Sequence, residues 1–574
     1  MNRMTRRAAL GAAIAGSAAA CARTASRRSY EAVGAESNAI FAHGVASGDP
    51  APDSVVLWTR VSTSEPVALT WEMSGDEAFS SITVSGEVEA RAESDFTAKV
   101  VASGLAPGAR YYYRFRVGDA ISPIGRTRTL PTGAIEAARF GVISCSNFPF
   151  GHFNVYDLVA RDEDLDAVIH VGDYIYEYGA SEGEYGASEG ARLNRPHDPP
   201  HELTSLDDYR RRHAQYKSDP CLQAAHAAHP FIVVWDDHEV ANDTWSGGAE
   251  NHDPRTEGDW SARKRAALQA YYEWMPIREP DLARPREAIF RSFSYGDLLT
   301  VAAIETRLTA RSESFEYNVI VPTLTSPEAI ARFRDEILWS KDRELLGAAQ
   351  IDYLRGALKS SMDKGQAWRL IANQVIMAKV TAPNLEPHLT EGDLAELEAQ
   401  WDQARAFVKF STLGLPTNLD AWDGYPAARE RFYDVVRETS GADGLLVVTG
   451  DTHTWWANDL VAKDGAHVGV ELGCHSVTSP SPYRKEFLGG KGAEYALLTG
   501  QDNEDVRYIS GEDHGYIALT VARDEVDARF VAVSTIESPH YDAFEKAGFT
   551  IRKSGGKAQF AGVRGLSLKE RAVF

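Results

Sequence analysis

The sequence predicts a layered α/β domain preceded by a smaller all-β domain. Residues 41–134 contain short β-branched and aromatic runs divided by Gly, Pro and Asp turns, a pattern typical of a β-sandwich. From residue 137 onward, apolar runs alternate with segments of helical spacing, as in parallel sheets covered by helices. Four of these runs end directly in residue types that bind metals, which predicts a site at the carboxyl ends of the strands.

The composition narrows the classes of function. The chain has 574 residues, 44% of them hydrophobic, which is ample for more than one domain. Its formal charge of -22 argues against nucleic acid as the main partner, because a phosphate backbone requires a basic surface. No apolar run reaches the roughly 18 residues that a membrane-spanning helix needs.

Residues 1–22 have the pattern of an export signal. Arg6 and Arg7 resemble a twin-arginine motif, an alanine-rich stretch follows, and residues 18–20 offer a small-residue cleavage site. We therefore expect the twin-arginine export machinery as a partner and a periplasmic or secreted mature protein. Cys21 offers the alternative of a lipid anchor, although Ala18 stands where such signals usually carry a larger aliphatic residue.

After a linker at 23–38, the all-β domain is expected to comprise residues 39–134 and to form an immunoglobulin-like or fibronectin-like sandwich. Its predicted strands lie at 54–58, 67–71, 81–84 and 110–117. The tryptophans and tyrosines of these strands are interpreted as core, so no chemistry is assigned to this domain.

The α/β domain is expected to comprise residues 137–540, with a C-terminal tail at 541–574. Segments of helical spacing lie at 206–227, 260–274, 346–362 and 427–439, and further strands are predicted at 368–375 and 516–521. A Gly-rich acidic segment at 178–190 follows one strand end directly. It fits a mobile flap or a passive surface loop equally well.

Four strand ends carry the candidate chemistry. The apolar runs within 139–145, 166–176, 230–239 and 444–453 lead to seven side chains: Cys145, Asp173, Tyr176, Asp237, His238, Asp451 and His453. Because parallel strands bring their carboxyl ends to one edge of a sheet, we expect these groups to converge in one crevice. Any one of them alone could be a turn, a helix cap or a satisfied core residue, but the repetition favours a site.

Cysteine usage adds to this expectation. Once the signal is removed, Cys145, Cys221 and Cys474 remain, an odd number for an exported protein. A free thiol outside the cytoplasm is at risk of oxidation unless it is buried or bound to metal. Cys145 is therefore a candidate ligand, while Cys221 and Cys474 either pair or, as we favour, are small core residues.

In these motifs the chain resembles the PhoD family of alkaline phosphatases and phosphodiesterases, which is similar to the purple acid phosphatases among calcineurin-like metallophosphoesterases. The resemblance extends from residue 41 to about residue 535 and rests on residues 44–50, 57–60, 144–146, 172–176, 236–239 with Asn242, 373–374 and 450–453. It implies a four-layer α/β sandwich, of the α+β kind, for the catalytic domain. It also implies hydrolysis of small-molecule phosphate monoesters or diesters.

The resemblance further implies that one metal, iron(III) or Fe(3+), is held by Cys145, Asp173, Tyr176 and His453. Thiolate and phenolate suit such a strongly Lewis-acidic ion. Asp173 would bridge to a second metal position.

That second position would be formed by Asp237 and Asp451, assisted by Asn242 or Asn373. This set consists almost entirely of oxygen ligands, which favours a hard ion, and the resemblance points to calcium, Ca(2+).

The expected mechanism follows from phosphoester chemistry. Two cations bridging a phosphoryl group neutralise its charge and activate a water, so the expected nucleophile is a metal-bound hydroxide without a phosphoenzyme. His238 is the candidate proton donor to the leaving group. Arg307, at the end of another predicted strand, would contact phosphate or form an ion pair.

Two alternatives remain at this point. One is a phosphodiesterase with phospholipase-D-like substrates. The other is an exported binding protein with a purely structural metal centre, which is disfavoured because structural sites are closed and commonly rich in Cys and His.

Overall fold

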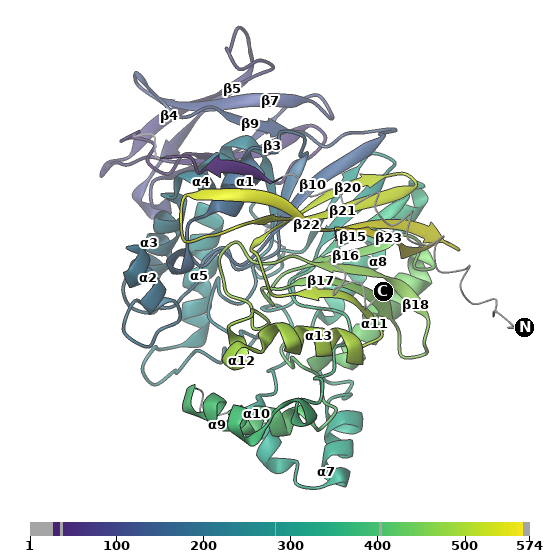
Figure 1. Ribbon diagram of the computed structural model, residues 1–574. Helices are drawn as coiled ribbons and strands as arrows, with labels where there is room; N and C mark the ends of the chain where they lie inside the picture. Colours follow the sequence, from purple (N-terminus) through teal and green to yellow (C-terminus); the bar gives the residue numbers. More distant parts are fainter. Residues whose placement is uncertain (1–26, 35–37, 282, 401–403, 566–574) are drawn as a thin grey trace, which may run out of the picture.

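The computed structural model describes residues 27–34, 38–281, 283–400 and 404–565. The predicted export signal and Cys21 lie outside these residues. Figure 1 shows stacked sheets with helices on their outer faces. A small β-sheet lies at one end of the molecule, and a helical segment with α7 (Pro327–Arg332), α9 (Glu391–Gln400) and α10 (Ala404–Ser411) lies at the other.

The larger sheet has eleven strands and contains three of the four predicted strand ends. Its order is β1 (Arg28–Glu31), β22 (His540–Ser554), β21 (Glu525–Val533), β20 (Gly515–Ala522), β10 (Ala137–Ile143), β11 (Ala167–His170), β12 (Pro230–Val233), β2 (Val45–Gly48), β3 (Ser54–Arg60) and β6 (Thr97–Ser103), with β23 (Lys557–Arg564) paired to β22. The strands β10, β11 and β12 are parallel and adjacent, with Val142, Ile169 and Ile232 in register. Their carboxyl ends therefore lie together.

The fourth predicted strand end belongs to a second sheet of seven strands. Its order is β13 (Arg291–Tyr295), β14 (Leu299–Ala303), β15 (Trp368–Ala372), β16 (Leu445–Thr449), β18 (His467–Gly473), β17 (Trp455–Val461) and β19 (Val506–Ser510). Alternate residues of β15 face opposite sides. Leu370 enters the core shared with the larger sheet, and Ile371 packs in a second core with α8 (Gly347–Asp363) and α11 (Pro426–Ser440).

Helices on the far face of the larger sheet complete four layers, which confirms the predicted fold class. They are α1 (Asn154–Ala160), α3 (Leu206–Lys217), α4 (Pro220–Ala228) and α5 (Trp260–Trp274). The predicted helix at 206–227 is two helices, because Asp219 caps a new helix whose first residue is Pro220. Shorter helices are α2 (Ala187–Leu193), α6 (Tyr317–Ile320), α12 (Phe487–Gly490) and α13 (Gly492–Asp502).

The N-terminal region is a sandwich, but one of its sheets is not its own. A five-stranded sheet of β5 (Ile82–Ala90), β4 (Val67–Ser74), β7 (Arg110–Val117), β8 (Ala120–Ile121) and β9 (Gly125–Arg128) packs on β3 and β6. The strand β2 pairs in parallel with β12, so the second layer of this sandwich continues into the catalytic sheet. Residues 39–134 and 137–540 were expected to form separate domains, but strands from both ranges belong to the same eleven-stranded sheet.

The expectation of a tail from residue 541 is wrong for residues 541–565. They form most of β22 and all of β23, which extend the larger sheet as a hairpin. The physical reason is visible in β22, where Tyr541, Ala547, Phe549 and Ile551 are buried in the main core. Among the described helices, none is both long enough and apolar enough to cross a membrane.

Candidate metal centre

The structure brings the first predicted ligand set together. Cys145 follows β10, Asp173 follows β11 and His453 follows β16, and their ligand atoms lie within 4.8 Å of one another. The Tyr176 hydroxyl donates a hydrogen bond to Asp173 Oδ2 at 3.1 Å and lies 3.2 Å from His453 Nε2. Thiol, carboxyl, phenol and imidazole thus meet at one point between the two sheets.

The backbone at these positions is strained. Cys145, Asp173, Asp451 and His453 have φ values of 60°, 55°, 62° and 51°, in the left-handed region that non-glycine residues rarely adopt. Such strain costs of order 1–3 kcal/mol per residue and concentrates at functional sites. These four residues follow three strands, β10, β11 and β16, and each strand end has a left-handed turn at a candidate ligand.

Gly172 permits the close approach of two strand ends, those of β11 and β12. Its φ is 111°, and a Cβ at this position would lie 2.7 Å from the backbone nitrogen of Asp236. Only glycine fits, because the obstacle is backbone of the neighbouring strand end.

The acids of this cluster need a cation to be ionised together. Burial, and then the charge of Asp173, raises the pKa values of Cys145 and Tyr176 well above their ordinary values. Burial also raises the pKa of Asp173, and its Oδ1 is buried without a hydrogen-bond partner in the described part of the chain. Cys145, Asp173 and Tyr176 repel one another when all three are ionised, and Asp173 Oδ1 has no hydrogen-bond donor. A metal ion of high positive charge at this point would stabilise the ionised forms and bind the free oxygen.

His453 is held in the form that binds a metal. Its Nδ1–H donates to the carbonyl oxygen of Pro480 at 3.0 Å, which leaves Nε2 facing the cluster. Burial lowers the pKa of His453 to about 3, so the imidazole is neutral. The neighbouring Ser479 hydroxyl donates to the Tyr176 oxygen at 2.7 Å and orients it.

A second group of acids adjoins the first. Carboxylate oxygens of Asp236, Asp237 and Asp451 lie within 4.8 Å of one another, and Asp173 forms a similar group with Asp237 and His238. Asp173 is thus common to both neighbourhoods, as a bridging ligand must be. This oxygen-only set suits a hard cation such as calcium.

The two asparagines predicted to assist differ. Asn242 lines the same pocket as the acids. The amide of Asn373 is engaged within the protein, since Nδ2 donates to the carbonyl of Val375 at 2.5 Å and Oδ1 accepts from the Trp422 indole at 3.2 Å. The ligand role of Asn373 stays a prediction that this geometry does not support.

Arg307 is fully buried beneath the acids. Its Nη2 lies 3.1 Å from Asp451 and 3.3 Å from Asp237, and it also pairs with Asp236 and Asp420. Of the two roles left open by the sequence, the structure shows the ion pair. Direct contact with phosphate would require this guanidinium to leave four carboxylates.

His238 lies at the edge of the cluster and is linked to a carboxylate that sequence reasoning missed. Its Nδ1 is 2.8 Å from Oε2 of Glu177, and its ring lies 4.1 Å from the ring of Tyr176. Burial alone would lower the pKa of His238, but Asp237, Glu177 and Asp173 together raise it well above the ordinary value. These three carboxylates therefore favour the protonated form of the imidazole.

Two further acids organise the site without having been predicted. Glu239 accepts hydrogen bonds from the backbone N–H groups of Asp173 and Asp236, at 3.1 Å and 2.7 Å, and so ties two strand ends together. Asp420 bridges Arg307 and Arg311 from a distant loop. The run 236–239 gave a signal for Glu239, whereas nothing adjacent to Asp420 in the sequence marks it.

The Gly-rich segment 178–190 lies against the site. The ring of Tyr185 is 6.3 Å from that of Tyr176 and 4.8 Å from that of Phe150, and Ala187 begins α2. Cys221 and Cys474 are both free and buried, as favoured, and Cys474 Sγ lies 3.2 Å from the Ser144 hydroxyl.

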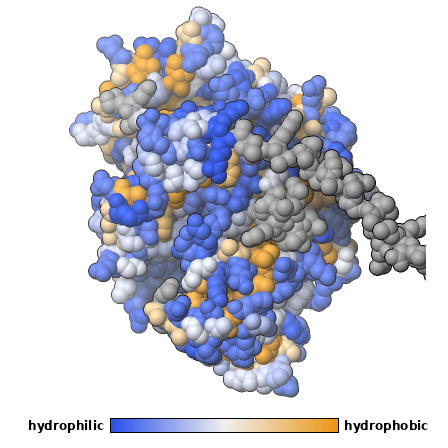
Figure 2. Space-filling view, in the orientation of Figure 1, coloured by the Kyte–Doolittle hydropathy of each residue, from blue (hydrophilic) through white to orange (hydrophobic). Residues whose placement is uncertain are grey.

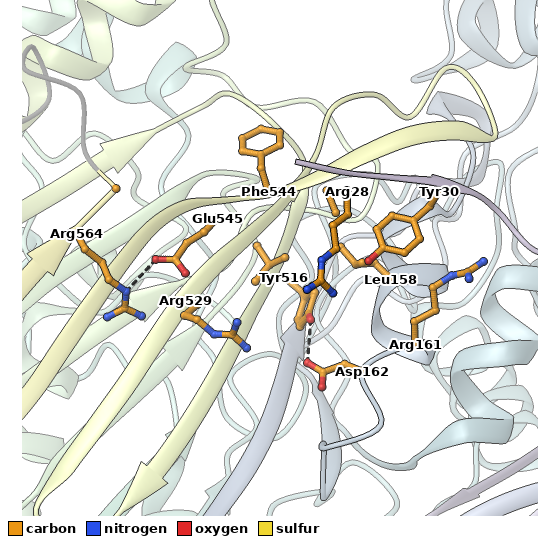
Figure 3. Close-up of a pocket in the computed structure, with 13 residues that line it drawn as sticks. Arg28, Tyr30, Leu158, Arg161, Asp162, Tyr516, Arg529, Phe544, Glu545 and Arg564 are labelled. Carbon is orange, nitrogen blue, oxygen red and sulfur yellow. Dashed lines mark hydrogen bonds and ion pairs between the residues drawn. The ribbon is translucent and has the colours of Figure 1, made fainter. Parts of the chain in front are cut away.

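The acids and both histidines open into a pocket of about 350 Å³. A larger cavity of about 690 Å³ lies elsewhere, between β1, α1 and the strands β20 to β23 (Figure 3). Four arginines surround it, of which Arg161 and Arg564 are paired with Asp157 and Glu545. None of the predicted ligands lines the larger cavity, so cavity size alone would misplace the chemistry.

Comparison with known proteins gives one consistent result. A family model described as PhoD-like phosphatase matches residues 140–530, and another, described as PhoD-like phosphatase, N-terminal domain, matches residues 25–131. Alkaline phosphatase D of Bacillus subtilis (strain 168) is 33% identical over 535 residues, covering 89% of this chain and 81% of the relative. A solved structure of PhoD is similar with a TM-score of 0.73 and 28% identity, covering 94% of this chain and 97% of that chain. The first match spans every strand end that contributes to the cluster.

Proposed function

The chain belongs to the PhoD-like phosphatase family and is a phosphoric ester hydrolase, and on that premise we propose how its strand-end cluster hydrolyses phosphate monoesters or diesters. In this proposal iron(III) is held by Cys145, Asp173, Tyr176 and His453. Calcium is held by Asp173, Asp237 and Asp451, with Asn242 beside them. When bound, such a pair of cations supplies Lewis acidity toward the phosphoryl oxygens.

One observation carries the proposal. The Cys145 thiol, the Asp173 carboxylate and the His453 imidazole have ligand atoms within 4.8 Å of one another, and the Tyr176 hydroxyl lies within hydrogen-bonding distance of the carboxylate and the imidazole. The same carboxylate adjoins an all-oxygen set. A structural zinc site would be closed and would not share a carboxylate with a second cluster that opens into a pocket.

The protein's own residues have distinct tasks in this mechanism. Glu239 ties the strand ends at Asp173 and Asp236 together through their backbone N–H groups, and Gly172 allows these strand ends to lie close to each other. Arg307 keeps the carboxylates of the second set oriented. His238, held by Glu177 and protonated, donates a proton to the departing alkoxide, a contribution of about 10²- to 10⁴-fold in rate.

The test is a metal analysis combined with a substrate panel. The purified protein should contain iron and calcium and should hydrolyse p-nitrophenyl phosphate or its bis-ester. Prolonged dialysis against EGTA should remove calcium and activity together, and calcium should restore activity better than zinc. A preparation that is fully active without either metal would overturn the assignment.

Steady-state kinetics on both esters also decide between monoester and diester preference. Export by the twin-arginine route is a part of the proposal that rests on Arg6 and Arg7. Replacing both by Lys should retain the protein in the cytoplasm, and a Cys21→Ser variant tests the lipid anchor by labelling with a fatty-acid analogue.

A further inference from the structure

The catalytic pocket has two chemically different sides. One side carries the acids and the histidines of the metal centre. The other side, which we call the apolar wall, consists of Ile376, Val380, Phe407, Ala421, Trp456, Pro482, Tyr483, Phe487 and Tyr495. We infer that the apolar wall binds the organic group of the ester, so that the enzyme prefers alkyl and aryl phosphoric esters to polyanionic ones. This inference rests on the proposed function of the metal centre.

The apolar wall is pre-formed. The rings of Trp456 and Tyr483 meet edge to face at 5.7 Å, those of Tyr483 and Tyr495 stack at 4.9 Å, and that of Phe407 lies 5.9 Å from Tyr495. Ile376, Trp456 and both tyrosines also belong to the second hydrophobic core. A wall fixed in this way loses little conformational entropy when a ligand packs on it.

The wall comes from segments outside the strands that hold the metal ligands. Phe407 lies on α10, Phe487 on α12 and Tyr495 on α13. Figure 2 shows hydrophobic side chains at the surface over α12 and α13 on an otherwise mostly hydrophilic face, and Leu497 of α13 is 40% exposed. The helices α12 and α13 thus carry apolar side chains both in the pocket and on the surface.

The charges around the pocket exclude a second anionic group. Among the described residues that line the pocket none is Lys or Arg, whereas Asp243 and Asp423 are present in addition to the metal-site acids. Asp423 is already paired with Arg429 at 2.6 Å. A second phosphate or a carboxylate on the substrate would lose its hydration without gaining a cation, which is costly.

An apolar group gains free energy in the same place. Burying one methylene is worth ~0.8 kcal/mol, which corresponds to about a fourfold change in affinity. A volume of about 350 Å³ is at the small end for ligand pockets, which suits one phosphoryl group with a short alkyl chain or a single ring.

The experiment measures inhibition of p-nitrophenyl phosphate hydrolysis by methyl-, ethyl-, propyl- and butylphosphonate, which share one head group and are not hydrolysed. The inhibition constant should fall about two- to fourfold with each methylene. 3-Phosphonopropionate, which replaces the end of the butyl chain by a carboxylate, should bind at least about tenfold more weakly than butylphosphonate. A flat series, or equal binding of these last two ligands, would overturn the inference.

Two variants locate the effect. Phe407→Ala and Phe487→Ala should each reduce the ratio of the methyl- to the butylphosphonate inhibition constants by about fivefold or more, with metal content retained. Trp339→Ala is the matched control, because Trp339 packs on Lys463 and does not line the pocket. A ratio unchanged in both Phe variants would contradict the assignment of the wall.

The outcomes separate the two proposals. If the protein hydrolyses no phosphoric ester, the proposed function fails, and phosphonate binding is then measured by calorimetry. If it hydrolyses p-nitrophenyl phosphate but shows no dependence on chain length, the proposed function stands and only the apolar subsite fails.

Discussion

Cys145 has the least replaceable side chain at the site. A serine hydroxyl has nearly the same shape but remains protonated in a buried setting and is a poor ligand for iron. We therefore expect Cys145→Ser to lose iron, the associated visible absorption, and at least about 100-fold in kcat/KM while the fold is retained.

Elemental analysis, the visible spectrum and a thermal melt measure these three effects. Cys221→Ser is the control, since Cys221 is also buried and free but lies on α4. Retention of iron and colour by Cys145→Ser would remove Cys145 from the ligand set.

The rate loss caused by replacing His238 should be larger for substrates with poorer leaving groups. His238→Ala should slow alkyl phosphates by about 10²- to 10⁴-fold and p-nitrophenyl phosphate much less, because p-nitrophenolate leaves without protonation. Metal content is measured in parallel. Equal losses for both substrates with metals intact would mean that His238 positions the phosphoryl group rather than donating a proton.

The same histidine predicts a pH dependence. Only its protonated form donates, so activity should fall as pH rises through the pKa of His238. Glu177 is one of three carboxylates that raise this pKa. Glu177→Gln should therefore move the alkaline limb of the pH–rate profile for alkyl phosphates to lower pH, and a shift to higher pH would contradict the assignment.

At the residue scale, the sequence could predict the side chains that directly follow a strand. Cys145, Asp173, Asp237, Asp451 and His453 each do so, and the polarity switch from buried strand to ligand marks them. The partners of Arg307 could not be predicted. Asp420 reaches Arg307 from 113 positions along the chain, and such a pairing depends on tertiary packing alone.

At the scale of single elements, replacing a glycine by alanine is expected to change stability in opposite directions at two positions. Gly172 is confined by the backbone of Asp236, so Gly172→Ala should lower stability by more than about 2 kcal/mol and reduce metal content. Gly356 lies exposed within α8 with no atom within 4 Å of an added Cβ. Gly356→Ala should raise stability by about 0.5–1 kcal/mol through helix propensity.

Urea unfolding of both variants checks this pair of expectations. Metal analysis after purification checks the further effect expected at Gly172. If Gly172→Ala were as stable as the unchanged protein, the two strand ends could not be as tightly apposed as described.

The positions of the strands in the chain could be predicted from the sequence, but the pairing between strands could not. The runs at 139–145 and 444–453 each contain a strand, β10 and β16, yet these strands belong to different sheets. A single apolar run does not indicate which other strand it pairs with, because strand pairing depends on contacts between residues that are distant in the sequence. The hairpin of β22 and β23 was different. Apolar residues alternate with glycine or polar residues over 547–552, a pattern typical of a strand, and the expectation of a tail does not take this pattern into account.

At the scale of the whole molecule, a buried lysine marks the junction between the N-terminal sandwich and the catalytic core. Lys217 Nζ lies 4.7 Å from the ring of Trp58 on β3 and donates to the hydroxyl of Tyr174, next to Asp173, at 3.0 Å. No carboxylate of the described residues pairs with it, and burial lowers its pKa well below 10.5.

This lysine should make stability depend on pH. The folded state binds fewer protons than the unfolded state between the two pKa values of Lys217, so the free energy of unfolding should rise with pH up to about 10.5. Lys217→Met removes this contribution and leaves Tyr174 bonded to His226 at 2.8 Å. We expect the variant to melt at least about 2 °C higher at pH 7, with a smaller gain at pH 10.

Lys359→Met, an exposed change on α8, is the control and should shift the melting temperature equally at both pH values. A gain at Lys217→Met that grows from pH 7 to pH 10 would contradict the sign derived from burial.

The pairing of β1 with β22 has a consequence for the order of events in synthesis. Residues 28–31 can form their strand pair at the edge of the larger sheet only after residues 540–543 have been synthesised. Ribosomes elongate at about 5–20 residues per second, so the first strand precedes its partner by roughly half a minute to two minutes. The nascent chain must keep an unfinished sheet edge from aggregating over that interval. Completion of this edge therefore requires residues 540–543, and any transport that requires a finished fold begins only after these residues have been synthesised.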